Sequence, residues 1–177
     1  MEYASFWRRI GAYSIDAIVL LPIMALSYFF GERYRLFNLF WLLPETVFGI
    51  WFNVYLVSKY GGTPGKLLLG TKIAMLDGSP ITLKAAVIRH SIFFALSFST
   101  ALSLALASLS ITDELYFSLG YLAKVDALKA LTPPWFELAM AGIQFWVVSE
   151  FISMLFNKKR RALHDFMAGT VVIRFKQ

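Results

Sequence analysis

The acidic residues that lie inside apolar segments carry the main chemical signal in this sequence. Asp16 lies within the first apolar stretch and Glu45 within the second, whereas Glu137 and Glu150 lie toward the two ends of the last. An acidic side chain at the centre of a membrane helix costs about 3 kcal/mol. Such residues usually face a bundle interior or an aqueous cavity and mark ion or proton pathways. Asp16 and Glu45 are therefore candidate groups of such a pathway, with a structural ion pair as the competing interpretation.

Asp16 shares a helix face with two other polar residues. Arg9 and Tyr13 precede it by seven and three residues, which places all three side chains on one side of a helix. Seven residues rise by about 10 Å. That separation is too long for a direct bond between Arg9 and Asp16, so we expect Asp16 to have a partner on another helix. Tyr13 joins the pathway candidates because it lies between them.

Glu45 follows Pro44. A proline within a helix removes a hydrogen bond and leaves a backbone carbonyl without its helical partner. Transporters build ion sites from interrupted helices whose freed carbonyls lie beside charged groups. The pair Pro44-Glu45 therefore favours a pathway role for Glu45.

The last apolar segment adds two weaker candidates. Gln144 follows Glu137 by seven residues and shares its face, and Glu150 lies near the end of the segment, within reach of Arg89 or His90. Near an interface, a structural ion pair is the simpler interpretation for an acid. The pathway candidates are Asp16, Glu45, Tyr13, Gln144 and Glu150.

Other kinds of chemistry have little support in the sequence. Cys is absent, so thiol chemistry and disulfides are excluded. His90 and His164 are far apart and form no metal-binding pattern. The run Gly61–Lys66 resembles a phosphate loop, but Tyr60 stands where that motif requires Gly and Leu67 where it requires Ser or Thr. We expect no enzymatic activity, no cofactor, no metal site and no nucleic-acid partner.

The composition predicts the elements that hold these residues. The chain has 177 residues, of which 58% are hydrophobic and 16% are charged, with a mean hydropathy of +0.63. A soluble domain is about a quarter charged. The hydrophobic residues form blocks long enough to cross a bilayer. We predict an all-α membrane protein, one domain over residues 1–177, with transmembrane helices at about 10–30, 36–57, 85–109 and 135–156.

The positive charges predict the orientation of these helices. Twelve Lys and Arg residues fall on the side that holds both termini and the loop after the second helix, against four on the other side. Basic residues accumulate on the cytoplasmic side, so both termini are predicted to be cytoplasmic. The run Lys158–Arg161 would also attract anionic lipid headgroups.

Two connecting segments are long enough to have structure. The cytoplasmic segment 59–84 contains Gly61–Gly65, which breaks any regular helix, and Asp77-Gly78, a signal for a hairpin turn. It predicts either a short β-hairpin or an amphipathic segment on the membrane surface. Residues 110–132 have leucines near helical spacing and predict one helix or two short ones on the outer surface.

Three stretches together resemble a known family. They are 6–16, with Arg9 and Asp16; 62–70, followed by Asp77-Gly78; and 160–172, with Asp165. The chain resembles the RDD family of small bacterial membrane proteins, named for one arginine and two aspartates. The resemblance implies that these residues are Arg9 (or its neighbour Arg8), Asp16 and Asp165. It also implies a bacterial cytoplasmic membrane and a suspected role in transport, in some members sodium–proton exchange.

These observations lead to two functional hypotheses. The first is a transporter of a small cation or other small solute, with or without coupling to protons, in which Asp16 and Glu45 share a water-accessible cavity. So small a bundle is expected to need a homo-oligomer for this. The second is a non-catalytic scaffold or accessory subunit, whose acids are dry and paired. In either case we expect Arg9 to pair with Asp165 and the tail to fold back under the bundle. Exchanging those two residues is then expected to restore folding.

Overall fold

Four long helices form the body of the molecule. The computed structural model describes residues 2–175, and within that range four helical segments are long and apolar enough to cross a membrane. This confirms the predicted four-span helical architecture. The spans are α1 (Phe6–Arg33), the continuous segment of α2 (Phe37–Ile50), η1 (Trp51–Tyr55) and α3 (Leu56–Tyr60), then α5 (Leu83–Ser110) and α8 (Trp135–Phe156).

Two of the long helices, α1 and α5, begin at a residue whose side chain caps the helix. The Ser5 side chain accepts a hydrogen bond from the Arg8 amide at the start of α1, and the Thr82 side chain accepts one from the Ala85 amide at the start of α5. Both satisfy amide groups that a helix leaves without an internal partner. η1 is a π-helical turn inside the second span. Such turns are frequent at functional sites.

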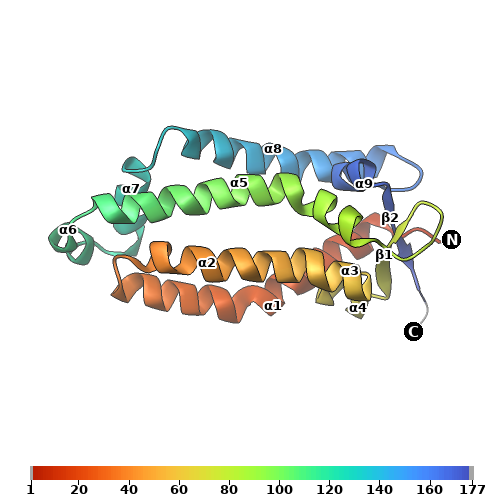
Figure 1. Cartoon of the computed structure of the whole chain (residues 1–177), viewed down its shortest axis with the longest axis horizontal. Coiled ribbons are helices and arrows are strands. Elements are labelled where there is room, and N and C mark those ends of the chain that lie inside the picture. The colour runs from red at the N-terminus through yellow and green to blue at the C-terminus, as the bar shows by residue number, and fades with distance from the viewer. Residues whose placement is uncertain (1, 176–177) are drawn as a thin grey trace.

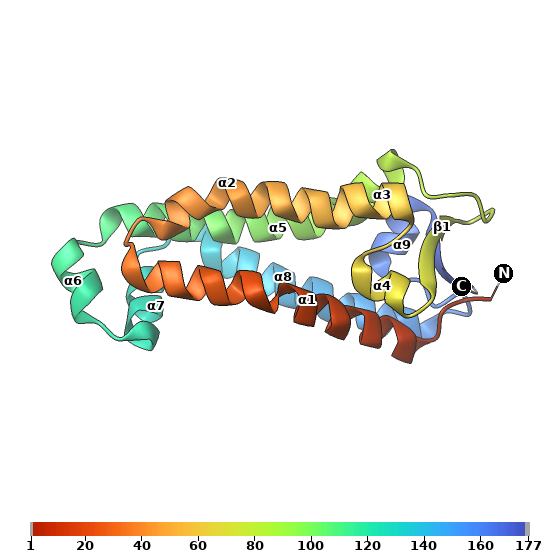
Figure 2. The ribbon, with the colours of Figure 1, turned by 90° about the horizontal axis from the view of Figure 1, so that it is seen from below.

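The long helices lie side by side along the long axis of the molecule (Figures 1 and 2). Helix α5 packs against α2 and α8, whereas α1 makes most of its contacts with α4 (Pro64–Leu68). Both termini and the strands of a short β-sheet lie at one end of the molecule, which we call the sheet end (Figure 1). Helices α6 (Asp113–Ser118) and α7 (Tyr121–Ala130) lie at the opposite end, which we call the α7 end.

A two-stranded sheet links the loop after the second span to the C-terminal segment. Strand β1 (Thr71–Met75) pairs antiparallel with β2 (Thr170–Arg174), with Ile73 opposite Val172. The β interpretation of this loop is thus supported, and Gly78 takes a left-handed conformation (φ +89°) in the predicted turn. The main partner of β1 is nevertheless the distant tail, and the turn itself adds only an isolated bridge between Ala74 and Pro80. A turn motif encodes local pairing and carries no information about a partner a hundred residues away.

The segment 110–132 forms the two short helices α6 and α7, as one of the predicted alternatives stated. They are attached to the bundle by polar contacts. Arg35 Nε lies 2.5 Å from Asp113 Oδ1, and Lys124 Nζ lies 3.1 Å from Glu32 Oε2. The two short helices at the α7 end are therefore tied to α1 and to the turn after it.

Candidate functional site

Asp165 is the centre of a buried ion cluster at the sheet end. It lies in the first turn of α9 (Leu163–Ala168) and is completely buried. Its Oδ2 atom accepts hydrogen bonds from Arg9 Nη2 (2.6 Å) and from the Ala162 amide (3.0 Å). Its Oδ1 atom accepts one from Thr170 Oγ1 (3.0 Å) and one from the guanidinium of Arg89. This one carboxylate therefore joins α1, α5, α9 and β2.

The predicted pair of Arg9 and Asp165 is confirmed, and the tail does fold back onto the bundle. Arg9, not Arg8, is the buried arginine, and its Nη1 also donates to the Arg160 carbonyl (2.6 Å). Arg8 instead donates to the Leu69 carbonyl (2.9 Å). The structure thereby decides which of the two adjacent arginines belongs to the cluster.

Asp16 binds the start of α4. Its Oδ2 accepts a hydrogen bond from Thr63 Oγ1 (2.6 Å) and its Oδ1 accepts one from the Gly65 amide (2.7 Å). These contacts meet the expectation that Asp16 has a partner outside its own helix. A carboxylate at this position satisfies a free amide and is favoured by the positive end of the helix dipole. Asp16 therefore fixes the loop that follows the second span against α1.

Gly65 allows this contact because it has no side chain. A Cβ atom there would lie 2.2 Å from the Ala12 carbonyl oxygen and 2.9 Å from Asp16 Oδ1. The next residue, Lys66, is also buried, with its amine 3.3 Å from Thr63 Oγ1. The same amine lies 4.9 Å from the centre of the Tyr13 ring. A cation over an aromatic face is attractive, so Tyr13 has a structural partner here.

His164 links Arg89 of α5 to Glu150 of α8. Burial, followed by the charges of Arg89 and Arg9, lowers the pKa of His164 well below its usual value. The ring is therefore neutral at pH 7. Its Nε2 atom accepts from Arg89 Nη2 (2.7 Å), so the proton is on Nδ1, which donates to the Glu150 carboxylate.

The sequence predicts Arg89 or His90 as the partner of Glu150. This prediction is wrong, because neither residue bonds directly to Glu150. Glu150 is bonded to His164, and Arg89 reaches it only through that ring. The reason is the position of α9, which packs against both α5 and α8. His90 instead lies near the Phe94 ring, with 5.8 Å between ring centres.

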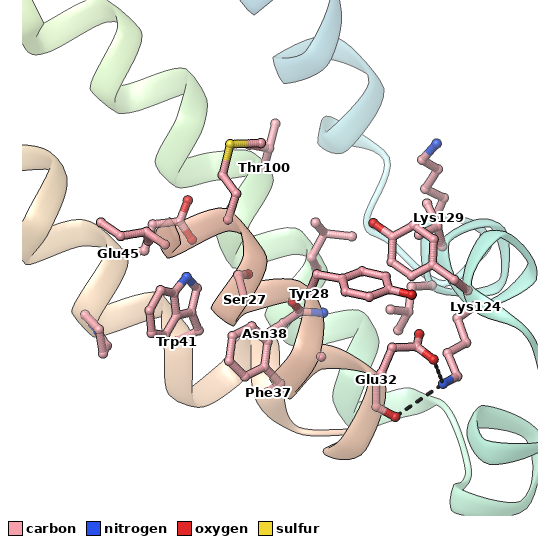
Figure 3. A pocket seen from close by; sticks show the side chains of 18 of the residues that line it. Ser27, Tyr28, Glu32, Phe37, Asn38, Trp41, Glu45, Thr100, Lys124 and Lys129 are labelled. Atoms are coloured by element: carbon pink, nitrogen blue, oxygen red, sulfur yellow. Dashed lines mark hydrogen bonds and ion pairs between the residues drawn. The ribbon is translucent and has the colours of Figure 1, made fainter. Parts of the chain in front are cut away.

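A cavity occupies the other half of the bundle, toward the α7 end. Its volume is about 840 Å³, and it lies between α1, α2, α5, α7 and α8 (Figure 3). Glu45, Trp41 and Phe37 line it from α2. In the described part of the chain, no hydrogen-bond or ion-pair partner contacts the Glu45 carboxylate. At the α7 end Lys124 is paired with Glu32, as the dashed lines of Figure 3 show.

The structure does not bring the pathway candidates together. Of the five, Glu45 alone belongs to the lining of this cavity. Asp16 is held by α4, and Tyr13 and Glu150 lie near the ion cluster. Gln144 is exposed on α8 and has no hydrogen-bond partner among residues 2–175. The expectation of one cavity shared by Asp16 and Glu45 is not met.

Sequence reasoning missed several groups that contact Asp16 and Asp165. Thr63 and Gly65 belong to a stretch that predicts only a helix-breaking turn, and Thr170 belongs to a tail in which Asp165 alone has a predicted partner. His164 is far from His90 and has no predicted role. The usable signal is that His164 and Thr170 lie close to Asp165 in the sequence, whereas no local pattern connects Thr63 or Gly65 with Asp16. The identity of each partner depends on the three-dimensional arrangement.

Comparison with known protein families identifies the family of this chain. The RDD family pattern matches residues 3–169, nearly the whole chain. The chain belongs to the RDD family. No curated protein and no solved structure gives a significant match. In this RDD protein Arg9, Asp16 and Asp165 lie at the sheet end, in buried contacts that join the loop and the tail to the bundle.

Proposed function

We propose that this RDD protein moves a small cation or other small solute across the bacterial cytoplasmic membrane, and that the cavity beside Glu45 receives it. The observation that carries the proposal is a carboxylate within an apolar span that faces a large cavity and has no partner in the described chain. Such a group is costly in a membrane. A bound cation would compensate that cost, and a proton could replace the cation during coupling.

The two ends of the bundle have different roles in this proposal. The excess of basic residues makes the sheet end cytoplasmic, so the cavity faces the outside. The contacts of Asp16 with α4 and of Asp165 with two arginines then close the cytoplasmic end. Release of the solute inside would require these contacts to separate. The basic run Lys158–Arg161 would lie near anionic lipid headgroups on that side.

A scaffold or accessory subunit is the second candidate, and one observation favours it. Among the described residues, no buried side-chain nitrogen or oxygen lacks a hydrogen-bond partner. Asp16 and Asp165 are thus dry and paired, as expected of structural groups. In this alternative the ordered loop and tail form a docking surface, and the polar clusters serve only to hold it.

Ion flux in proteoliposomes separates the two candidates. Purified protein would be reconstituted with a pH-sensitive dye inside the vesicles, and gradients of sodium, potassium, lithium and tetramethylammonium would be applied in turn. We expect cation-dependent proton flux that is lost in Glu45→Gln. Glu137→Gln is the matched control, because Glu137 is an exposed acid of α8 outside the cavity lining. Absence of flux from folded wild-type protein with every cation tested would favour the scaffold. Cross-linking of the reconstituted protein tests the homo-oligomer that we infer for a bundle of this size.

A further inference from the structure

The chemistry of the cavity wall indicates what kind of cation it would hold. We propose that the cavity binds an organic cation, such as a substituted ammonium with apolar groups, between Glu45 and the aromatic side chains around it. This inference rests on the proposed function only in taking the cavity as the solute site. It names the ligand class, which the transport proposal leaves open.

Helix α2 presents an aromatic surface to the cavity. The Glu45 carboxylate lies at the end of this surface that is farther from α7, which we call the deep end. Phe37, Trp41 and Glu45 are spaced by four residues, so they lie on one face of the helix, and Phe48 continues the cavity lining. The Phe37 and Trp41 rings stack with their centres 5.3 Å apart. Figure 3 shows Trp41 between Phe37 and Glu45 along this face. Tryptophan is the strongest aromatic partner of a cation, and aromatic surfaces recognise quaternary ammonium groups.

The part of the lining formed by α1 and α7 is also aromatic. Tyr28 of α1 lines the cavity, and its ring contacts that of Tyr121 with centres 4.8 Å apart. Ser27 and Asn38 add a hydroxyl and an amide to an otherwise mostly apolar lining. Such a wall suits the hydrocarbon part of a ligand, while the carboxylate suits its charge.

The size of the cavity also favours an organic ligand. Pockets for drug-sized molecules have volumes of roughly 300–1,000 Å³, and this cavity has about 840 Å³. A bare alkali ion is far smaller. A site for such an ion replaces the hydration shell with closely spaced oxygen atoms, whereas the wall beside Glu45 consists largely of rings and aliphatic groups.

The remaining charges leave Glu45 as the dominant group at the deep end. Lys124 is paired with Glu32 and also lies over the Tyr116 ring, 4.9 Å from its centre. Lys129 is exposed at the α7 end, and Figure 3 shows its amine directed away from Glu45. The charge at the deep end is therefore negative, which favours a cation over an anion of the same shape.

Two ions of equal size and opposite charge test this inference. Binding of radiolabelled tetraphenylphosphonium and, in separate samples, of radiolabelled tetraphenylborate to purified protein in detergent would be measured, with empty micelles as the blank. We expect saturable binding of the phosphonium and no saturable binding of the borate. Glu45→Gln should weaken binding about tenfold or more, and Trp41→Leu about thirtyfold, since a desolvated cation–aromatic contact is worth about 2 kcal/mol. Glu137→Gln should bind like wild type.

Several results would overturn the inference. These are equal binding of the two ions, wild-type affinity in Glu45→Gln, or alkali-ion flux from a protein that binds no phosphonium. Phosphonium binding without any flux would support the inference and contradict the transport proposal, so the two failures are distinguishable. If Glu45→Gln is not monodisperse on size exclusion, Trp41→Leu and the comparison of the two ions on wild-type protein decide.

Discussion

Arg9 Nη2 and Asp165 Oδ2 lie 2.6 Å apart although 156 residues separate them in the sequence. The same carboxylate also contacts the Arg89 guanidinium, so a single buried anion is held between two buried cations. A second guanidinium on one carboxylate makes the contact more than a simple pair. The sheet end of the bundle is therefore tightly packed and connected.

Replacing the shared carboxylate should destabilise the protein strongly. In Asp165→Asn, Arg9 and Arg89 lose their common counter-charge in a buried setting. Removing one partner of a buried ion pair costs about 3–5 kcal/mol. The measurement is the free energy of unfolding in detergent, with Asp113→Asn as the control. Asp113 is 67% exposed and pairs with Arg35, so its loss should cost no more than about 1 kcal/mol. Equal effects of the two variants would show that the cluster is not a structural centre.

Exchanging the two residues of the pair should not restore stability. The sequence alone suggests that Arg9→Asp combined with Asp165→Arg would rescue a simple pair. In the structure, an arginine at position 165 would face Arg89 and would no longer accept the Ala162 amide. We expect the exchanged protein to unfold as readily as Asp165→Asn in the same assay. Recovery to wild-type stability would mean that Arg89 and the amide contribute little.

A methyl group at Gly65 should separate α4 from α1. The Cβ of Gly65→Ala would lie 2.2 Å from the Ala12 carbonyl oxygen, a distance that the backbone must shift to relieve. We expect a loss of about 3 kcal/mol, the upper part of the range for overpacking. Gly49→Ala is the control, because nothing lies within 4 Å of its Cβ position. Alanine is favoured over glycine in a helix by about 0.5–1 kcal/mol, so this variant should be slightly stabilised. A Gly65→Ala protein as stable as wild type would contradict the tight packing of α4.

The neutral state of His164 should make stability depend on pH. Its pKa is lowered in the folded protein by burial and by Arg89 and Arg9, whereas the unfolded chain takes up a proton near pH 6.5. Below that pH the unfolded state binds more protons than the folded state, so the folded protein loses stability as the pH falls. The contribution of His164 to stability is therefore full above about pH 6.5 and is lost below it. The slope approaches about 1.4 kcal/mol per pH unit.

Unfolding of wild type and His164→Gln at pH 7.5, 6 and 5 isolates this contribution. Glutamine keeps an acceptor for Arg89 and a donor for Glu150 but does not titrate in this range. The variant should lose less stability than wild type between pH 7.5 and 5. Parallel pH profiles for the two proteins would rule out His164 as the titrating group.

Much of the fold follows from the sequence because a bilayer imposes simple rules on length and polarity. The spans were expected from local patterns, and the two short helices near Asp113 and Tyr121 and the strand before Asp77 each match one of two predicted alternatives. The partner of that strand was not, because β2 follows it by about a hundred residues and no local pattern encodes the pairing. Arg9 and Asp165 were paired correctly, since both carry motif charges on the same predicted side.

The rest of the candidate site depends on packing that periodicity does not show. Glu150 binds His164 only because α9 lies against α5 and α8. Asp16 and Glu45 belong to similar sequence contexts, acids within apolar spans, yet one is held by α4 and the other faces a cavity. Depth in a span therefore identified both acids as unusual and left their different roles undetermined.

Accessibility of an introduced cysteine tests the central claim, which is that a solvent-reachable, cation-selective cavity opens away from the sheet end. The chain has no native Cys, so Ser27→Cys in the cavity lining and Ser103→Cys, a buried position on α5, can each be labelled alone. Membrane vesicles of known orientation would be treated with a trimethylammonium and a sulfonate methanethiosulfonate of similar size. We expect Ser27→Cys to react from the outer side, faster with the cationic reagent, and to lose that preference in Glu45→Gln. Ser103→Cys should stay unmodified. A Ser27→Cys protein that is unreactive from the outer side, or equally reactive toward both charges whatever stands at position 45, would contradict the claim.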